Sequence, residues 1–282
     1  MPTFDTPGPV TVTLDLLAAD VRITPADRTD TIVEVRPRDD GTDADVRAAE
    51  QTRVEFTDGR LVVRMPKRRG LGLLGRSGTV DLTIALPTGS RLHADTAAAA
   101  TIRSTGQLGE CRLRTAAGDL ALHHTGTLDA TASAGEITVD RVDGSARVTS
   151  GSGQVRVGAV GGDLAVRTSN GDTTVGSVAG DLEARSANGD IVIERATGTV
   201  TATTANGDLR VDEAVAGRMS LRTNRGEVAV GVPAGTAAHL DLHTRYGRVE
   251  NDLASCAPPP TPAGTVEVTA RTSFGDIVIR RR

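Results

Sequence analysis

The stretch TSNGDTTVGSVAGDLEARSANGDIVIERATGTVTATTANGDLRV, from Thr168 to Val211, decides the fold because it contains Asn-Gly-Asp three times at equal spacing. Glycine recurs about every nine residues from Gly109 to Gly235, so two such steps make a repeat of eighteen. After each glycine of the repeat the second and fourth residues are mostly apolar, and the first and third are mostly polar or small. That period of two predicts a half-buried β-strand about five residues long.

Stacking of the repeats would bury these strands, since a strand of about five residues cannot bury an apolar face by itself. If each repeat is one coil, equivalent residues lie over one another at about 4.8 Å and form continuous inward columns. The sequence therefore predicts an all-β fold, a single parallel β-solenoid with two short strands in each coil. An antiparallel sandwich also has short alternating strands, but its loops vary more in length than these glycine steps do. The expected columns are Leu120, Ile137, Val155, Ile191 and Leu209; Leu122, Val139, Val157, Val175, Ile193 and Val211; and Val142, Val160, Val178 and Val215.

The chain divides into three segments by the regularity of the repeat. Residues 1–88 are less regular and predict an N-terminal β-rich cap that merges into the solenoid, because solenoids need atypical ends to protect open edges. Residues 89–250 hold the regular repeats. Residues 251–282 hold a proline-rich loop and then the returning motif GDIVI, which we expect to close the C-terminal end. In the cap we expect a short helix at Asp43–Gln51 and strands at Val10–Leu16, Val21–Thr24, Thr31–Val35, Arg53–Phe56, Arg60–Arg64 and Thr79–Leu86.

Charge and composition argue against several classes of partner. The formal net charge is -4 over 282 residues, and aromatic residues make up 1% of the chain. A nearly neutral chain has no field that would draw it to nucleic acid or anionic lipid, and single-stranded nucleic acid is bound by stacking on aromatic rings. We therefore expect no nucleic-acid partner and no stable membrane anchor. Cys111 and Cys256 lie too far apart for a disulfide framework or a zinc site, and the N-terminus has no secretory pattern, so we expect a cytoplasmic protein.

Five motifs resemble one known family. The series TAAGDLAL, TSNGDTTV, SANGDIVI and TANGDLRV, together with the ending RTSFGDIVIRR, is similar to the bacterial β-strand-repeat family labelled "putative adhesin", a domain of unknown function. The resemblance extends from Val10 to Arg280. It implies a β-solenoid fold, and it brings no catalytic residues that could be assigned to this chain.

The Asn-Gly-Asp triplets have two readings. Asp172, Asp190 and Asp208 would stack about 5 Å apart, and a column of carboxylates could hold Ca²⁺, as in aspartate-rich nonapeptide solenoids. In the other reading the triplet is a corner, because Asn and Gly tolerate positive φ and an Asp there satisfies turn amides. Both readings predict that the three aspartates lie in one outward column.

Two further patterns suggest ligand sites. His239, Asp241 and His243 alternate on one strand and would share its outer face, where a metal could bridge two of them, but a zinc site needs more ligands than these. The segment Gly70 to Gly75 has the letters of a dinucleotide fingerprint, yet a strand follows it where that fingerprint requires a helix. We therefore expect no cofactor.

The loop MPKRRGLGLLGRSG combines basic residues with leucines that the sequence leaves exposed. Such a loop could contact a partner protein or an anionic surface. The alternative is a long hairpin loop whose leucines fold over the cap. The candidate contact residues are Lys67, Arg68, Arg69, Leu71, Leu73, Leu74 and Arg76.

These features together predict a non-enzymatic interaction or scaffold protein with another protein as its partner. Solenoids commonly bind their partners along the extended surfaces that the regular repeats form. One alternative is a self-assembling polymer, since open coil ends can stack. Others are a calcium-binding or a glycan-acting β-helix. The sequence allows a homo-oligomer but does not indicate one.

Overall fold

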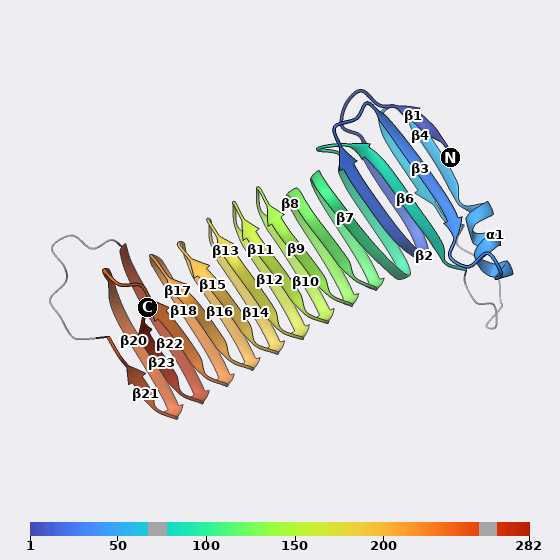
Figure 1. The fold of residues 1–282 in the computed structure, drawn as a ribbon. Helices are drawn as coiled ribbons and strands as arrows, with labels where there is room; N and C mark the ends of the chain where they lie inside the picture. Colours follow the sequence, from blue (N-terminus) through green and yellow to red (C-terminus); the bar gives the residue numbers. More distant parts are fainter. Residues whose placement is uncertain (67–77, 254–263) are drawn as a thin grey trace. The chain divides into compact units, whose positions relative to one another are not determined.

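The computed structural model describes residues 1–66, 78–253 and 264–282, and these form almost only β-strands (Figure 1). The chain divides into two compact units, Met1–Arg141 and Val142–Arg282. The described residues contain one helix, α1 (Asp43–Gln51), at the expected place. None of the helical structure in these ranges is long and apolar enough to span a bilayer.

The C-terminal unit consists of two stacks of parallel strands. Partners are eighteen residues apart up to β16 and β17, as in the pairs Leu164↔Leu182 and Ile191↔Leu209, and nineteen apart in the next step, as in Val200↔Met219. The parallel β-solenoid that the sequence predicts is therefore confirmed. The first stack contains β10 (Ala146–Ser152), β12 (Leu164–Asn170), β14 (Leu182–Asn188), β16 (Val200–Asn206) and β18 (Gly217–Arg225). The second contains β11 (Val155–Val160), β13 (Thr173–Val178), β15 (Ile191–Ala196), β17 (Leu209–Ala214) and β19 (Val228–Val232).

The core of this unit lies between the two stacks. Alternate residues of each strand are buried, including Val155, Ile191 and Leu209 of one expected column. The third column was predicted wrongly at its end. Ala214 pairs with Ala196 in that column and is buried, whereas Val215 follows β17 and is only half-buried.

Glycine is required at the corner that follows each strand of the first stack. Gly189 has φ +134°, a region that residues with a side chain rarely adopt. A Cβ on Gly189 would lie closer than 3.0 Å to the carbonyl oxygen of Gly171 in the preceding coil. The regularly spaced glycines therefore mark the places where the backbone of one coil lies closest to that of the next.

The last two coils are not stacked in chain order. After β19 the chain forms β20 (Thr236–Tyr246) and β21 (Val249–Asn251), and then β22 (Gly264–Phe274) and β23 (Ile277–Arg281). Strand β22 pairs with both β18 and β20, and β23 pairs with both β19 and β21. Figure 1 shows the same order.

The prediction that the final GDIVI motif closes the C-terminal end is therefore wrong, because β20 and β21 are outermost. The physical reason is burial. Val266 and Val268 of β22 are fully buried, whereas their partners Ala238 and Leu240 of β20 are half-buried. The more apolar, β-branched coil occupies the position with neighbours on both sides.

The N-terminal unit contains parallel strand pairs, like the C-terminal unit, and also antiparallel pairs. Strand β2 (Thr11–Ala26) is continuous where two strands, Val10–Leu16 and Val21–Thr24, were expected, because no glycine or proline lies between Leu16 and Val21 and a register shift between Leu16 and Ala18 absorbs the bend. Its first half pairs with β5 and its second half with β6. The strands are β1 (Thr3–Asp5), β2 (Thr11–Ala26), β3 (Asp30–Pro37), β4 (Arg53–Thr57), β5 (Arg60–Arg64), β6 (Val80–Pro87), β7 (Arg91–Ala117), β8 (Leu120–Ala134) and β9 (Ile137–Val142).

The N-terminal edge of this unit is built from short antiparallel strands. β1 pairs with β3, and β4 pairs with β5, both in the antiparallel sense. Phe4 of β1 and Phe56 of β4 stack with ring centroids 5.0 Å apart, and both side chains are half-buried. This aromatic pair links the two edge strands at the margin of the core.

Candidate functional site

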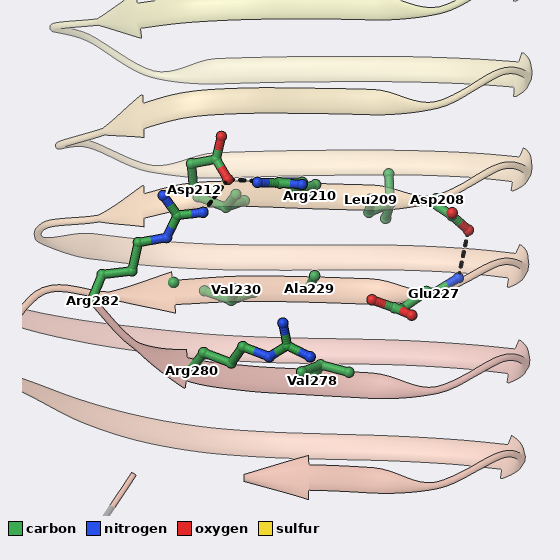
Figure 2. Close-up of a pocket in the computed structure, with 12 residues that line it drawn as sticks. Asp208, Leu209, Arg210, Asp212, Glu227, Ala229, Val230, Val278, Arg280 and Arg282 are labelled. Atoms are coloured by element: carbon green, nitrogen blue, oxygen red, sulfur yellow. Dashed lines mark hydrogen bonds and ion pairs between the residues drawn. The ribbon is translucent and has the colours of Figure 1, made fainter. Parts of the chain in front are cut away.

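The three aspartates of the triplets lie in one exposed column at the corner, as expected. Oδ1 of Asp172 accepts the backbone N–H of Asp190 at 3.0 Å, and Oδ1 of Asp190 accepts that of Asp208 at 2.8 Å. Asp208 in turn accepts the N–H of Glu227 at 2.7 Å (Figure 2). Each carboxylate therefore commits one oxygen to the next coil, in the manner of a helix N-cap.

The asparagines of the triplets form a parallel ladder beside this column. The side-chain amide of Asn188 donates to Oδ1 of Asn170 at 3.0 Å, and that of Asn206 donates to Oδ1 of Asn188 at 2.9 Å. Side-chain amides can form such chains because each one has both a donor and an acceptor. The triplet thus supplies a side-chain hydrogen bond at Asn and another at Asp. At glycine it supplies the space that the corner needs.

The histidine pattern on β20 lies where the sequence placed it. His239, Asp241 and His243 are exposed on the outer face of the strand. Asp241 forms an ion pair with Arg271 of β22 at 3.5 Å. Within residues 1–66, 78–253 and 264–282, no three or more His, Cys, Asp or Glu side chains are grouped so as to hold a metal ion. Metal binding here and at the aspartate column stays a prediction.

Two other features of the sequence can be located only in part. The basic loop residues Lys67, Arg68, Arg69, Leu71, Leu73, Leu74 and Arg76 lie outside the described residues, as does Cys256. Cys111 is buried in the N-terminal unit and forms no disulfide. Burial raises the pKa of its thiol to about 12, so it stays protonated at neutral pH and behaves as a small apolar side chain.

A groove crosses the outer face of the second stack of the C-terminal unit, over β17, β19 and β23 (Figure 2). Its volume is about 240 Å³. The strand in the middle, β19, presents the small residues Ala229 and Gly231 outward. Ala229 lies between Arg210 of β17 and Val278 of β23, and Gly231 lies beside Arg280 of β23. Because neighbouring strands are about 4.8 Å apart, a row of small residues between two rows of large ones leaves a trough along the strand.

Arginines and one aspartate line one end of the groove. Asp212 accepts from Arg210 at 2.6 Å and from Arg282 at 3.0 Å, so it holds two guanidinium groups together. The side chain of Arg280 is exposed and makes no hydrogen bond or ion pair with any residue that the structure describes. Its guanidinium is therefore available to a ligand.

The opposite end of the groove is acidic. Asp208 and Glu227 line it at the corner, and Asp208 already accepts one backbone N–H. Glu227 lies at the corner immediately before β19. Gly231 lies four residues further along the chain and is paired in register with Arg280 of β23. At about 3.3 Å per residue the backbone positions of Glu227 and Gly231 are about 13 Å apart, and the Arg280 side chain extends from the level of Gly231 toward Val278 (Figure 2). The groove is thus polarised along its length, with a free cation at one end and carboxylates at the other.

A second groove, of about 430 Å³, lies on the N-terminal unit. Both aspartates and arginines line it, among them Asp15, Asp95, Arg64 and Arg114. It offers less charge contrast to a ligand than the groove over β19. Neither groove was predicted, because each gathers residues from strands far apart in the sequence.

These coils, corners and outward rows define a parallel β-solenoid with two strands in each turn. The chain belongs to the Toastrack DUF4097 family, whose model matches residues 11–280. This match confirms the resemblance seen in the repeated motifs.

Solved structures that are similar to the chain include three bacterial proteins. One, described as a putative cell adhesion protein of Clostridium sporogenes, is 11% identical, with 100% of this chain and 98% of that chain covered and a TM-score of 0.20. A putative adhesin of Bacteroides fragilis is 11% identical, with 100% and 95% covered and a TM-score of 0.28. A putative lipid binding protein of Parabacteroides distasonis is 12% identical, with 100% and 95% covered and a TM-score of 0.32. No curated protein matches the chain.

Proposed function

We propose that the protein is a non-enzymatic interaction scaffold of the cytoplasm that holds an extended segment of a partner protein in the groove over β19. The observation that carries this proposal is the polarised groove itself, with the Arg280 side chain, which pairs with no described residue, at one end and Asp208 and Glu227 at the other. The family match supports the solenoid framework, and the partner and the compartment are part of the proposal.

An extended polypeptide fits this site better than a polyanion does. The trough runs along β19, so a peptide in β conformation would lie parallel or antiparallel to it, with alternate side chains facing the sheet. The two ends carry opposite charge, so the fitting segment has an acidic and a basic residue up to about 13 Å apart, which is up to four residues of extended chain. A polyanion would meet Asp208 and Glu227 with like charge.

Rigidity of the framework favours binding at such a shallow site. The walls of the groove lie on three strands joined by parallel ladders, with pairs such as Arg210↔Ala229 and Ala229↔Val278. Asp212 also fixes Arg210 and Arg282. Groups that are already ordered lose little conformational entropy when a ligand binds.

Fluorescence anisotropy with short labelled peptides tests the proposal. The probe peptide contains one Glu and one Lys separated by three Ser or Thr residues, and the comparison peptides carry two Glu or only Ser at those positions. We expect the mixed peptide to bind most tightly. Arg280→Gln should weaken its binding by about 0.2–1 kcal/mol, which is up to about fivefold in Kd.

Arg147→Gln is the matched control, because Arg147 is exposed on β10 in the other stack and its loss changes the net charge equally. It should leave the affinity unchanged. Equal weakening by both variants, or no difference among the three peptides, would show that the groove does not select its ligand in this way.

A further inference from the structure

The outermost coil of the C-terminal unit has an open edge. β20 is eleven residues long and pairs along one side with β22, and along its other side it pairs with no strand of the described chain. β21 likewise pairs only with β23 among these strands. A long unpaired edge presents a row of backbone N–H and C=O groups that a further strand can join.

The core is also open at this coil. The inward side chains Leu240 and Leu242 are half-buried, although their partners Val268 and Ala270 on β22 are fully buried. At the corner, Tyr246 is 62% exposed and Val249 is 45% exposed. Apolar side chains in a continuous exposed group are typical of a surface that another molecule covers.

The outer row of β20 is complementary to itself. It carries Asp241 and Arg245 on either side of His243, all exposed. If two copies of β20 pair antiparallel about a two-fold axis at His243, Asp241 of each copy lies opposite Arg245 of the other. Two favourable cross-strand pairs then form at once, and each contributes about as much as other opposite-charge pairs across strands.

The same two-fold axis, perpendicular to the strands and to the stacking direction, would continue both stacks. It places β20 against β20 and β21 against β21 of the second copy. In this register Leu242 of each copy lies opposite Thr244 of the other, and the two Leu242 side chains are diagonal neighbours across the new pair of strands. Such a contact uses one surface twice and closes after two subunits.

A head-to-tail polymer would instead need a matching open edge on the N-terminal unit. There the edge strands are short, β1 with three residues and β4 with five, and Phe4 stacks on Phe56 across them. Short edge strands are a common protection against further pairing. The contrast between the two edges favours a closed dimer.

We propose that the β20–β21 coil is the interface of a two-fold dimer with a second copy of this chain, joined by antiparallel pairing of β20. The interface is separate from the groove over β19, and its test does not depend on that groove.

Sedimentation velocity across a wide range of concentration tests the dimer in the full chain. The wild type should form dimers that do not grow into larger species. Asp241→Arg or Arg245→Asp alone should weaken the dimer at least tenfold, because each turns two attractive pairs into two repulsive ones. The double variant Asp241→Arg/Arg245→Asp restores both pairs and should restore the dimer, as should mixing the two single variants.

Circular dichroism shows whether each variant is folded, and the rescue by the double variant excludes misfolding as the cause of dissociation. Three results would overturn the proposal: a wild type that is monomeric at every concentration, a dimer that neither single variant weakens, or a series of species larger than the dimer. If this edge instead pairs with a strand of a different protein, the wild type will be monomeric at every concentration.

Discussion

Replacing Gly189 with alanine should destabilise the protein, because the corner of the coil has no room for a Cβ atom. Gly189 has φ +134°, and its Cβ would meet the carbonyl oxygen and carbon of Gly171 closer than 3.0 Å. Both atoms belong to backbone, so no side chain can turn aside to relieve the contact. The two coils would have to separate locally.

The expected loss follows from two contributions. A residue with a side chain in this backbone region costs about 1–3 kcal/mol. The ladder bond from Gly171 N–H to Asn188 O joins these two coils, is 2.9 Å long and would lengthen as they separate. It contributes about 1 kcal/mol, so we expect a total loss of about 2–4 kcal/mol.

Thermal unfolding followed by circular dichroism measures the effect. At about 2.1 cal/mol/K per residue, the entropy of unfolding implies that Tm falls by about 5 °C if the whole chain unfolds together and by about 10 °C if one unit unfolds alone. Gly8→Ala is the control, since a Cβ at Gly8 has no atom within 4 Å. If Gly189→Ala lowers Tm no more than Gly8→Ala does, the steric account of the corner is wrong.

Asp190→Ala should lower the free energy of unfolding by about 1 kcal/mol because it removes the acceptor of the Asp208 N–H, whereas Asp190→Asn keeps an acceptor oxygen and should change it by less than about 0.5 kcal/mol. Urea unfolding measures both, and a rise of Tm with calcium that Asp190→Ala abolishes would restore the metal-binding reading of the column. Burial raises the pKa of the Cys111 thiol to about 12 from an ordinary value of 9.0, so its contribution to stability is complete below pH 9 and is lost as pH rises toward 12. The stability of the wild type should therefore fall more steeply over that interval than that of Cys111→Ala, and equal slopes would contradict the assignment. Asn188→Ala breaks both ladder bonds of its amide and should cost about 1 kcal/mol in the same urea experiment, while an unchanged midpoint would show that the ladder contributes nothing.

The coil could be predicted from the sequence because its constraints are local. Glycine at the corner and apolar residues at alternate positions recur in each repeat, so Gly171, Gly189 and Gly207 mark equivalent places without knowledge of the neighbouring strands. The outward aspartate column followed from the same spacing. The error at Val215 arose where the repeat lengthens by one residue and the local count no longer identifies the inward position.

The order of the last coils could not be predicted, because β18, β20 and β22 have the same alternation. Their neighbours are decided by burial over the whole unit. The groove depends on that order: Arg210 and Arg280 are seventy residues apart in the sequence and line one groove only because β23 lies beside β19. Long-range pairing of this kind leaves no local motif.

The claim at the centre of this account is that the repeated triplet is a structural corner and that binding occurs in the groove over β19. An anisotropy titration of the labelled Glu-and-Lys peptide with three proteins tests it most directly. We predict that Asp172→Asn binds the peptide as the wild type does, and that Arg280→Gln binds it more weakly. The opposite pattern, with affinity lost in Asp172→Asn and retained in Arg280→Gln, would contradict the claim.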